Sequence, residues 1–369
     1  MKRSRSSVSR RGFLGAAAAV AAAPVVAHAQ QAPISLRFQS TWPTKDIFHE
    51  YATDFAKRTN EMSGGRLKID VLPAGAVVKA FDLLDAVHKG TLDGGHGVAA
   101  YWYGKNSAYS LFGTGPSFGM DANMLLGWME YGGGRDLYSE LQQKVMKLNV
   151  EGFLYGPMPT QPLGWFKKQV TGPGDFKGLK YRTVGLSVDV FKEMGAAVVA
   201  LPGAEIVPGL DRGLIDAAEF NNTSSDRLLG FPDVSKICML QSYHQPIECF
   251  EILFNKTKYD ALSADLRNII RAAAHASSAD MSWKAMARNS TDYYEMRDKQ
   301  NVKFFRTPKE VLQAQLAAWD KVVAAKSAEN AFFAKVVDSQ RKWAQRVVGW
   351  SQDVNIPGEL AYQHYFKKS

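Results

Sequence analysis

The chain has 369 residues, of which 46% are apolar and 22% are charged, and this length is sufficient for two domains with separate cores. The formal net charge is +9, but residues 1–29 hold five basic residues and no acidic one, so the remainder has 40 basic against 36 acidic residues, or +4. That balance, without a basic patch interleaved with aromatic residues, excludes nucleic acid as an expected partner.

Residues 1–29 have the pattern of an export signal. A basic segment precedes the apolar run at 13–26, and the following AHA, ending at Ala29, matches a small-x-small cleavage site. The sequence SRRGFL at 9–14 resembles the twin-arginine motif, although a Sec signal with two arginines would look similar. Either pathway predicts a signal peptide that is cleaved near Ala29 and a mature protein in the periplasm.

Segments typical of strands and helices alternate along the mature chain, which predicts an α/β fold with mostly parallel sheets. Strands are expected at 34–38, 67–72, 149–155, 164–166, 197–201, 214–218, 237–242 and 249–254, with a further strand ending at Arg182. Helices are expected at 47–62, 79–88, 187–194, 203–212, 264–289 or further, 308–325 and 328–348. The segment GPMPTQP at 156–162 indicates a crossing between lobes, and the strand at 249–254 is expected to cross back.

A phrase in the second half of the chain repeats one in the first half. LDAVHKGTLDGGH at 84–96 and GLDRGLIDAAEF at 209–220 both contain the end of a helix, a glycine, two residues, an aspartate and two small residues. Gly90 corresponds to Gly213, and Asp93 corresponds to Asp216. The separation of about 120 residues is too long for a solenoid repeat. We therefore expect two similar α/β lobes with a site between them.

Glu219 follows the predicted buried strand of the second phrase. A buried carboxylate is costly unless it is paired, and ligands of open α/β sheets bind at the carboxyl ends of strands. Glu219 is therefore either a paired structural acid or a site residue. The adjacent aromatic residues at 101–103 also follow a strand, where they can line a pocket or wedge a loop.

Two further features concern covalent structure and assembly. Cys238 and Cys249 lie in consecutive predicted strands, and we interpret them as two buried thiols, with a disulfide as the alternative in an oxidising compartment. Four large apolar residues of the tail, Leu360, Tyr362, Tyr365 and Phe366, are typical of a terminal helix that packs on a partner.

Together, these motifs resemble the solute-binding proteins of TRAP transporters, the DctP-type periplasmic receptors. The resemblance covers nearly all of the mature chain and depends on LDAVHKGTL at 84–92, GWF at 164–166, FKGLKYR at 176–182 and GLIDAAE at 213–219. It implies a two-lobed fold with crossing strands, a long connecting helix and a C-terminal helical region. It also implies a receptor that passes a small organic acid to the TRAP membrane permease subunits.

The resemblance further implies roles for individual residues. Arg182 matches the arginine that binds the substrate carboxylate, for which a planar guanidinium is well suited. Its alternative is a structural ion pair between the lobes. One branch of the family binds 2-oxo and 2-hydroxy monocarboxylates together with a metal ion. That branch has a Gln four residues before a Trp, which matches Gln161 and Trp165 here. It also has a Glu followed by an aromatic residue, which matches Glu219 and Phe220. Carboxylate, amide and main-chain oxygens favour Na⁺ or Ca²⁺ over zinc.

Other residues complete the predicted site. Gln245 and Glu248 are candidate additional metal ligands, whereas we expect His244 to be a packed polar group. The residues expected to contact the substrate are Arg182, Gln161, Tyr101, Trp102, Phe220 and Asn221. Phe220 replaces the Trp of that branch, which changes the pocket wall.

The resulting prediction is a non-enzymatic periplasmic receptor, with a secreted enzyme acting on a small carboxylic acid as the alternative. Lobe I is expected to contain residues 30–155 with about 250–305, and lobe II residues 156–249 with about 306–348. Residues 349–369 are expected to form a helix that mediates homodimerisation.

Overall fold

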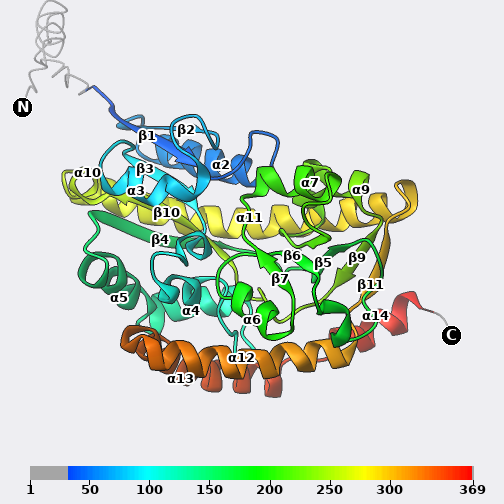
Figure 1. The fold of residues 1–369 in the computed structure, drawn as a ribbon. Helices are drawn as coiled ribbons and strands as arrows, with labels where there is room; N and C mark the ends of the chain where they lie inside the picture. The colour runs from blue at the N-terminus through cyan, green and yellow to red at the C-terminus, as the bar shows by residue number, and fades with distance from the viewer. Residues whose placement is uncertain (1–31, 368–369) are drawn as a thin grey trace, which may run out of the picture. The chain divides into compact units, whose positions relative to one another are not determined.

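Two β-sheets form the framework of the computed structural model, which describes residues 32–367 (Figure 1). The predicted signal peptide at 1–29 lies outside the described residues. The first sheet has five strands, in the order β2 (Leu67–Leu72), β1 (Ile34–Ser40), β3 (Gly94–Gly97), β10 (Cys249–Asn255) and β4 (Val150–Pro157). The second has six strands, in the order β11 (Lys303–Arg306), β9 (Ile237–Leu240), β5 (Gly164–Phe166), β8 (Ala217–Ala218), β6 (Lys180–Arg182) and β7 (Ala197–Val199).

One interior strand of each sheet is antiparallel to its neighbours, because the chain crosses between the sheets at that strand. β10 runs antiparallel to β3 and β4, and β5 runs antiparallel to β8 and β9. Residues 158–163 lead from β4 to β5, and residues 241–248 lead from β9 back to β10. The two crossing segments are joined by main-chain hydrogen bonds, including Gln161 N to Gln245 O at 3.3 Å. Both predicted crossings are therefore confirmed, and they place Gln161 beside Gln245.

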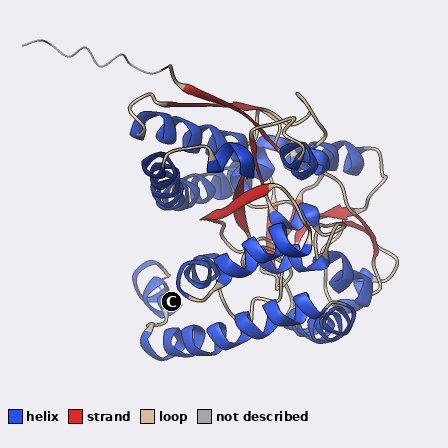
Figure 2. Ribbon diagram, turned by 90° about the vertical axis from the view of Figure 1, so that its left-hand side faces the viewer, coloured by secondary structure: helices blue, strands red, loops and turns tan. Residues whose placement is uncertain are grey.

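Helices cover the sheets, as Figure 2 shows. The shorter helices are α2 (Ile47–Met62), α3 (Leu83–His88), α4 (Ala122–Tyr131), α5 (Gly134–Ser139), α6 (Ser187–Glu193), α7 (Gly203–Asp211), α8 (Thr223–Leu229), α9 (Phe231–Val234) and α10 (Lys256–Asp260). The longer ones and the terminal helix are α11 (Ala264–Lys299), α12 (Lys309–Glu329), α13 (Ala331–Val354) and α14 (Gly358–Phe366). Within residues 32–367, no helix is both long and apolar enough to cross a membrane.

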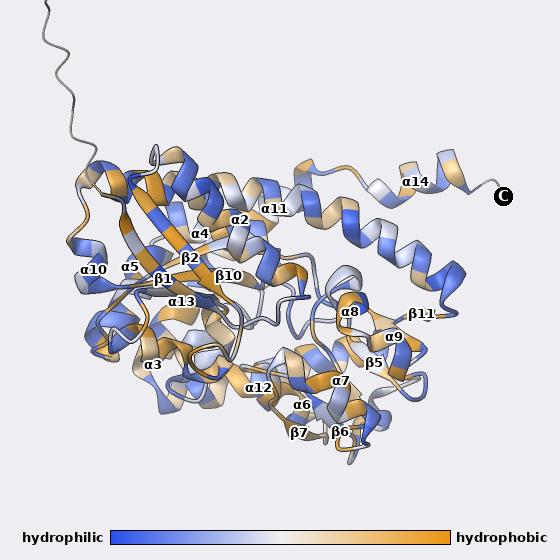
Figure 3. Cartoon of the chain, turned by 90° about the horizontal axis from the view of Figure 1, so that it is seen from above, coloured by the Kyte–Doolittle hydropathy of each residue, from blue (hydrophilic) through white to orange (hydrophobic). Residues whose placement is uncertain are grey.

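Helix α11 is the predicted long connecting helix. Its 36 residues span about 54 Å at 1.5 Å per residue. It packs against α2 and strand β4 of the first sheet and against α8 beside the second sheet (Figure 3). α12 packs on α6, whereas α13 packs on α4, α5 and the turn at 107–112. The predicted lobe boundaries assigned residues 306–348 to lobe II. Because α13 packs on α4 and α5, this segment does not pack with the second sheet alone.

The internal repeat has the same local structure in both sheets. Helices α3 and α7 are each followed by a left-handed glycine, Gly90 with φ +75° and Gly213 with φ +71°. Asp93 Oδ2 accepts from Arg37 N on β1 (2.8 Å), and Asp216 Oδ2 accepts from Lys180 N on β6 (3.2 Å). The aspartates thus fasten β3 and β8 to the neighbouring parallel strand. The predicted strand at 214–218 is shorter than expected, because β8 begins at Ala217.

The cysteines lie in different sheets. Cys238 is on β9 and Cys249 is on β10, and both are buried free thiols, as the interpretation of two thiols predicted. Burial raises the pKa of each thiol well above its ordinary value, so both stay neutral at physiological pH. They therefore serve as small apolar side chains of the core.

Candidate functional site

A buried polar cluster lies where the carboxyl ends of β6 and β8 meet the two crossing segments. Arg182, the last residue of β6, is in register with Ala218, the last residue of β8, and Glu219 follows directly. The Arg182 side chain is 1% exposed and that of Glu219 is fully buried. This is the end of a parallel strand pair at which ligands of α/β proteins bind.

Arg182 is held in place by its own sheet. Its Nε and Nη2 donate to Leu201 O at 2.9 and 2.7 Å, and its Nη1 donates to Glu219 O at 2.9 Å. Nη1 also lies 2.9 Å from Glu219 Oε1, which makes a buried ion pair within one sheet. The guanidinium carbon lies 5.7 Å from the centre of the Phe220 ring. The protein's own carboxylate therefore satisfies the arginine at this site.

The side-chain amide of Gln161 faces three oxygen atoms at once. It lies 3.0 Å from Glu219 Oε2, 2.8 Å from Gln245 Oε1 and 2.9 Å from Phe220 O. With its nitrogen on this side, the amide donates hydrogen bonds to these oxygens. With its oxygen on this side, four oxygens converge, and such an oxygen-only set is the environment that Na⁺ and Ca²⁺ prefer. The site can therefore hold a hard cation.

Gln245 and Glu248 extend the cluster along the second crossing segment. Gln245 Nε2 donates to Glu248 Oε2 at 3.0 Å, so the Gln245 oxygen is directed at Gln161. Burial, together with the nearby Glu219 carboxylate, raises the pKa of Glu248 to about 8. Glu248 Oε1 has no hydrogen-bond partner among residues 32–367. Nowhere in that range do three His, Cys, Asp or Glu side chains gather for a metal.

Aromatic and aliphatic side chains close the space above this cluster. Its walls include Trp42, Phe48, Tyr101, Met158 and Phe220. The space that remains between these side chains measures about 20 Å³, enough for about one water-sized occupant. The Tyr101 hydroxyl has no hydrogen-bond partner among the described residues. The cleft is thus closed on its own side chains, with polar atoms still available to a ligand.

Comparison with known proteins assigns the chain to a family. The model of the bacterial extracellular solute-binding proteins of family 7, DctP, matches residues 38–330. The chain belongs to this family. Its members are solute-binding receptors, which confirms the predicted receptor class over the secreted enzyme.

Several relatives of this solute-binding protein are known. A monocarboxylate 2-oxoacid-binding periplasmic protein of Nostoc sp. is 29% identical over 90% of this chain and 89% of its own. A TRAP periplasmic solute-binding protein of Pseudoalteromonas atlantica with bound sodium and pyruvate is 30% identical, with a TM-score of 0.83 over 91% of this chain and 100% of its own. A Bordetella bronchiseptica TRAP solute-binding protein is 27% identical, with a TM-score of 0.84 over 90% of this chain and 97% of its own. That protein is a dimer with copurified calcium and picolinate in one site and an apo second site.

Two residues predicted to contact the solute are placed elsewhere. Trp102 is fully buried in the core, and its Nε1 donates to the Glu251 carboxylate rather than facing the cleft. The sequence alone does not show which of Tyr101 and Trp102 faces the cleft. Both belong to one short helical turn, with one side toward the cleft and the other toward the core. Asn221 does not line the cavity, but its Nδ2 lies 3.0 Å from the sulfur of Met158, which does.

Residues that sequence reasoning missed lie mainly on the first lobe. Trp42 and Phe48 form the opposite wall, and Trp42 follows the carboxyl end of β1, a position that the strand-end rule could have indicated. Asp46 Oδ1 accepts from Ser225 Oγ at 2.9 Å and so joins α2 to α8. Burial raises the pKa of Asp46 to about 7.

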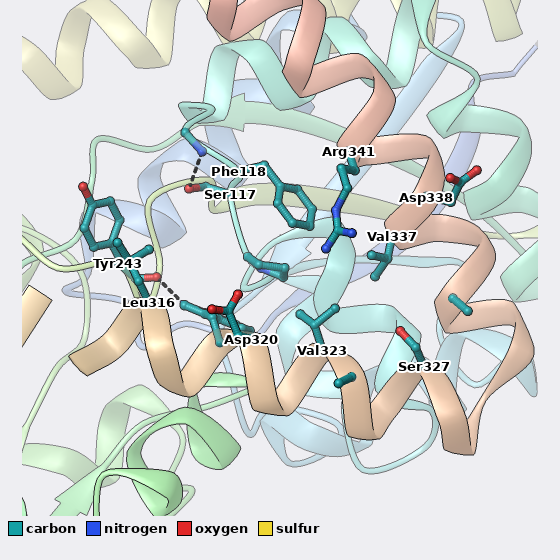
Figure 4. Close-up of a pocket in the computed structure, with 15 residues that line it drawn as sticks. Ser117, Phe118, Tyr243, Leu316, Asp320, Val323, Ser327, Val337, Asp338 and Arg341 are labelled. Atoms are coloured by element: carbon teal, nitrogen blue, oxygen red, sulfur yellow. Dashed lines mark hydrogen bonds between the residues drawn. The ribbon is translucent and has the colours of Figure 1, made fainter. Parts of the chain in front are cut away.

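A larger cavity of about 470 Å³ lies away from this cluster, between α12, α13 and the loop at 116–119 (Figure 4). Its floor is apolar, with Val323 and Val337, and Arg341 lies over the Phe118 ring at 5.2 Å from the ring centre. None of the predicted ligand or metal residues lines it. Size alone therefore does not identify the functional site of this receptor.

Proposed function

We propose that this solute-binding protein captures a 2-oxo or 2-hydroxy monocarboxylate of about pyruvate size together with Na⁺ or Ca²⁺. The observation that supports the proposal is the convergence of the Gln161 amide, Glu219 Oε2 and Phe220 O beside Arg182. Relatives that cover nearly the whole chain hold sodium with pyruvate or calcium with picolinate. The receptor would deliver its solute to the permease subunits of a TRAP transporter.

In this proposal Arg182 binds the solute carboxylate by exchanging partners. Its Nη1 now donates to Glu219 Oε1, while Leu201 O anchors Nε and Nη2 from the other side. A solute carboxylate that replaces Glu219 Oε1 gains a charge-assisted hydrogen bond from a guanidinium that is already oriented. The anchored Arg182 therefore needs little rearrangement, whereas the Glu219 carboxylate must turn away.

A second carboxylate next to Glu219 is repulsive unless positive charge lies between them. A bound cation supplies that charge, and it is chelated most readily by a solute with an oxygen adjacent to its carboxylate. Glu219, Gln161 and the main-chain oxygen of Phe220 would hold it, with Gln245 Oε1 as a further ligand. We place Glu248 outside this ligand set, because its carboxyl group contacts Gln245 rather than the convergent oxygens.

The walls limit the size of the solute. Trp42 and Phe48 contact the Phe220 ring, with ring centres 6.4 and 5.6 Å apart. The Tyr101 hydroxyl is the polar group best placed to meet a second oxygen of the solute, since it lines the cleft without a partner among the described residues. A compact acid with few carbons fits these walls better than a sugar acid.

The test is titration of pyruvate into chelator-treated protein by calorimetry, with and without added Ca²⁺ or Na⁺. We expect affinity to rise when either cation is present, and Glu219→Gln to abolish the rise. Equal affinity in both buffers, with Glu219→Gln binding as tightly as the wild type, would contradict the cation bridge. Native mass spectrometry of freshly purified protein would identify any solute that copurifies.

Solute entry requires the cleft to open, and we propose that the two sheets with their helices act as the two lobes. Lobe I would contain the first sheet with α13 and lobe II the second sheet with α12, while α11 packs with elements of both. The Asp46–Ser225 hydrogen bond and the bond from Lys45 Nζ to Leu229 O (3.2 Å) join their facing edges. Small-angle scattering with and without pyruvate and Ca²⁺ should report a smaller radius of gyration for the loaded form.

We also propose export by the twin-arginine pathway. Replacing both Arg10 and Arg11 with Lys keeps the charge of the signal but removes the motif. Periplasmic yield should then fall to the background level. An unchanged yield would instead identify the Sec pathway, for which the two charges are sufficient.

Finally, we propose that α14 mediates a homodimer. None of its residues is buried, and Tyr365 and Phe366 are 72% and 74% exposed. Exposed aromatic side chains at this density mark a contact surface, and the Bordetella bronchiseptica relative is a dimer. Light scattering should give a dimer for the mature chain and a monomer after truncation at Pro357. A truncated chain that remains dimeric would assign the interface to another surface.

A further inference from the structure

His244 lies fully buried beside Glu219, on the second crossing segment. Its Nδ1 is 2.6 Å from Ser242 Oγ, and its Nε2 faces Glu219, 3.9 Å from Oε2. That distance is too long for a hydrogen bond, and Nε2 has no partner among residues 32–367. A buried polar nitrogen is thus directed at the carboxylate of the proposed cation site, at a distance about one ångström longer than an ordinary N–H···O hydrogen bond.

The hydrogen bonds around Ser242 determine which nitrogen of His244 carries the proton. Tyr243 N donates to Gln315 Oε1 at 2.9 Å, which fixes the orientation of that amide, and Gln315 Nε2 donates to Ser242 Oγ at 2.8 Å. The main-chain nitrogen of His244 also donates to Ser242 Oγ, at 3.3 Å. Because a hydroxyl oxygen has two acceptor positions, both are taken, and Ser242 must donate its own hydrogen to His244 Nδ1. The proton of the neutral imidazole is therefore on Nε2, facing Glu219.

The hydrogen bonds around Ser242 and His244 are held in place by residues of α12. Gln315 is completely buried, and Trp319, one turn further along, donates from Nε1 to Tyr243 O at 2.7 Å, the dashed line beside Tyr243 in Figure 4. Ser187 Oγ donates to His244 O at 2.9 Å and holds the same segment from α6. The imidazole is thus fixed both in its orientation and in its tautomer.

We propose that His244 is a positioning residue that holds the Glu219 carboxylate when solute and cation are bound, an inference that rests on the proposed function. When the solute takes Arg182, Glu219 Oε1 loses its partner, and the carboxylate can turn to accept from His244 Nε2. One carboxylate oxygen is then oriented by the imidazole and the other is left for the cation. A neutral N–H donor orients the carboxylate without cancelling the charge that attracts the cation, which a lysine or arginine would do. Outer-shell partners of this kind typically change metal affinity by 10–100-fold.

The tautomer can be tested without a cation. Long-range ¹H–¹⁵N correlation spectra of the mature protein, assigned with a His244→Gln variant, distinguish protonated Nε2 from protonated Nδ1. We expect the Nε2–H form in the wild type and a mixture of tautomers in Ser242→Ala. A wild-type His244 protonated at Nδ1 would overturn the proposal, because no donor would then face Glu219.

The positioning role is tested by Ca²⁺ affinity, measured calorimetrically in saturating pyruvate. His244→Phe keeps the ring volume but removes the donor, and it should weaken Ca²⁺ binding by about 10–100-fold. His244→Gln retains an amide donor of similar reach and should stay within about threefold of the wild type. Ser235→Ala is the control, since it removes a buried hydroxyl that donates to Phe166 O, without contact to His244, and it should leave Ca²⁺ affinity unchanged. Thermal unfolding of each variant separates lost folding from lost binding.

The outcomes separate this inference from the proposed function. If His244→Phe binds Ca²⁺ as tightly as the wild type, the positioning role is wrong, although the cation site remains. If His244→Gln is as weak as His244→Phe, the ring itself and not its donor matters, which also contradicts the role. If pyruvate affinity in the wild type is independent of cations, the proposed function fails and this inference fails with it.

Discussion

The carboxyl ends of β3 and β8 have the same construction and different chemistry. Each strand follows a helix, a left-handed glycine and an aspartate that accepts a hydrogen bond from the adjacent parallel strand. Three residues after that aspartate stand His96 in the first sheet and Glu219 in the second. His96 is satisfied by Trp42 Nε1 at 2.8 Å and by the Tyr155 hydroxyl at 2.6 Å, whereas Glu219 belongs to the charged cluster beside Arg182.

The neighbouring strands show the same contrast. Gln39 of β1 is in register with Gly95, as Arg182 of β6 is with Ala218, so the two side chains occupy equivalent positions. Gln39 Oε1 accepts from Val77 N at 2.8 Å and Nε2 donates to Val78 O at 2.8 Å, which fastens a loop of its own lobe. The repeat thus determines where polar side chains end up, and residue identity determines whether they hold the fold or a solute.

The largest effect should come from breaking the charged pair at Arg182. Arg182→Lys keeps one positive charge but cannot contact Leu201 O, Glu219 and a solute carboxylate through one planar group. We expect a loss of about 2–5 kcal/mol in pyruvate binding, as for buried charge pairs at interfaces. Calorimetry in the presence of Ca²⁺ measures this. An affinity within threefold of the wild type would assign Arg182 to a structural ion pair.

Glu219→Gln should have the next largest effect and should be specific for the cation. The amide retains an oxygen but loses the charge, so solute and cation weaken together, because each forms part of the other's site. We expect at least about tenfold weaker pyruvate binding in Ca²⁺ and little change in its absence. Gln161→Ala should give the same pattern with a smaller amplitude. If the variants lose affinity equally in both buffers, Glu219 serves Arg182 rather than a cation.

The comparison also separates what the sequence could predict from what it could not. The repeat, the strand-end rule and the two crossings gave the positions of Gln161, Arg182 and Glu219, because local hydrogen bonding fixes them. The prediction placed Trp102 in the cleft, but the direction of its side chain depends on a contact with Glu251, which is more than a hundred residues away in the sequence. The opposite wall at Trp42 was missed for the same reason, since it depends on how the lobes meet.

The positions of the site residues along the strands and crossing segments could be predicted in outline, and their mutual contacts could not. The family resemblance implied oxygen ligands for a cation, and that ligand set stays a prediction. The ion pair between Arg182 and Glu219 within one sheet was not expected, because it follows from the register of β6 and β8. The relay to His244 depends on Gln315 of α12, which no local pattern connects with the crossing segment.

Gln39→Leu is the first-lobe counterpart of the Arg182 experiment, and it should affect stability instead of binding. The change leaves the main-chain groups of Val77 and Val78 without their buried partner, at about 1–3 kcal/mol for an unsatisfied group. Urea unfolding should show this loss, while pyruvate affinity stays within threefold of the wild type. Weak binding by a normally stable Gln39→Leu protein would mean that the equivalent positions are also equivalent in function.

The smallest expected effect at neutral pH is the contribution that protonation of His96, the counterpart of Glu219, makes to folding stability. Burial lowers the pKa of His96 to about 3, with a smaller contribution from the nearby His49. His96 should therefore stay neutral through the physiological range, whereas in the unfolded chain a histidine gains a proton near pH 6.5. Because the unfolded state binds the proton more tightly, the contribution of His96 to stability decreases as pH falls from about 6.5 towards 3.

The sign of that change distinguishes His96 from buried carboxyl groups. Burial raises the pKa of Glu251 to about 7, so its contribution to stability is present below about pH 4.5 and is lost as pH rises through 7. ¹H–¹³C NMR of the imidazoles, assigned with His96→Gln and referenced to protein in urea, follows His96 directly. We expect no titration of His96 between pH 5 and 8 in the folded protein. A titration midpoint of His96 near pH 6.5 would show that this position can carry charge. The two strand ends would then differ only in the residues that contact His96 and Glu219.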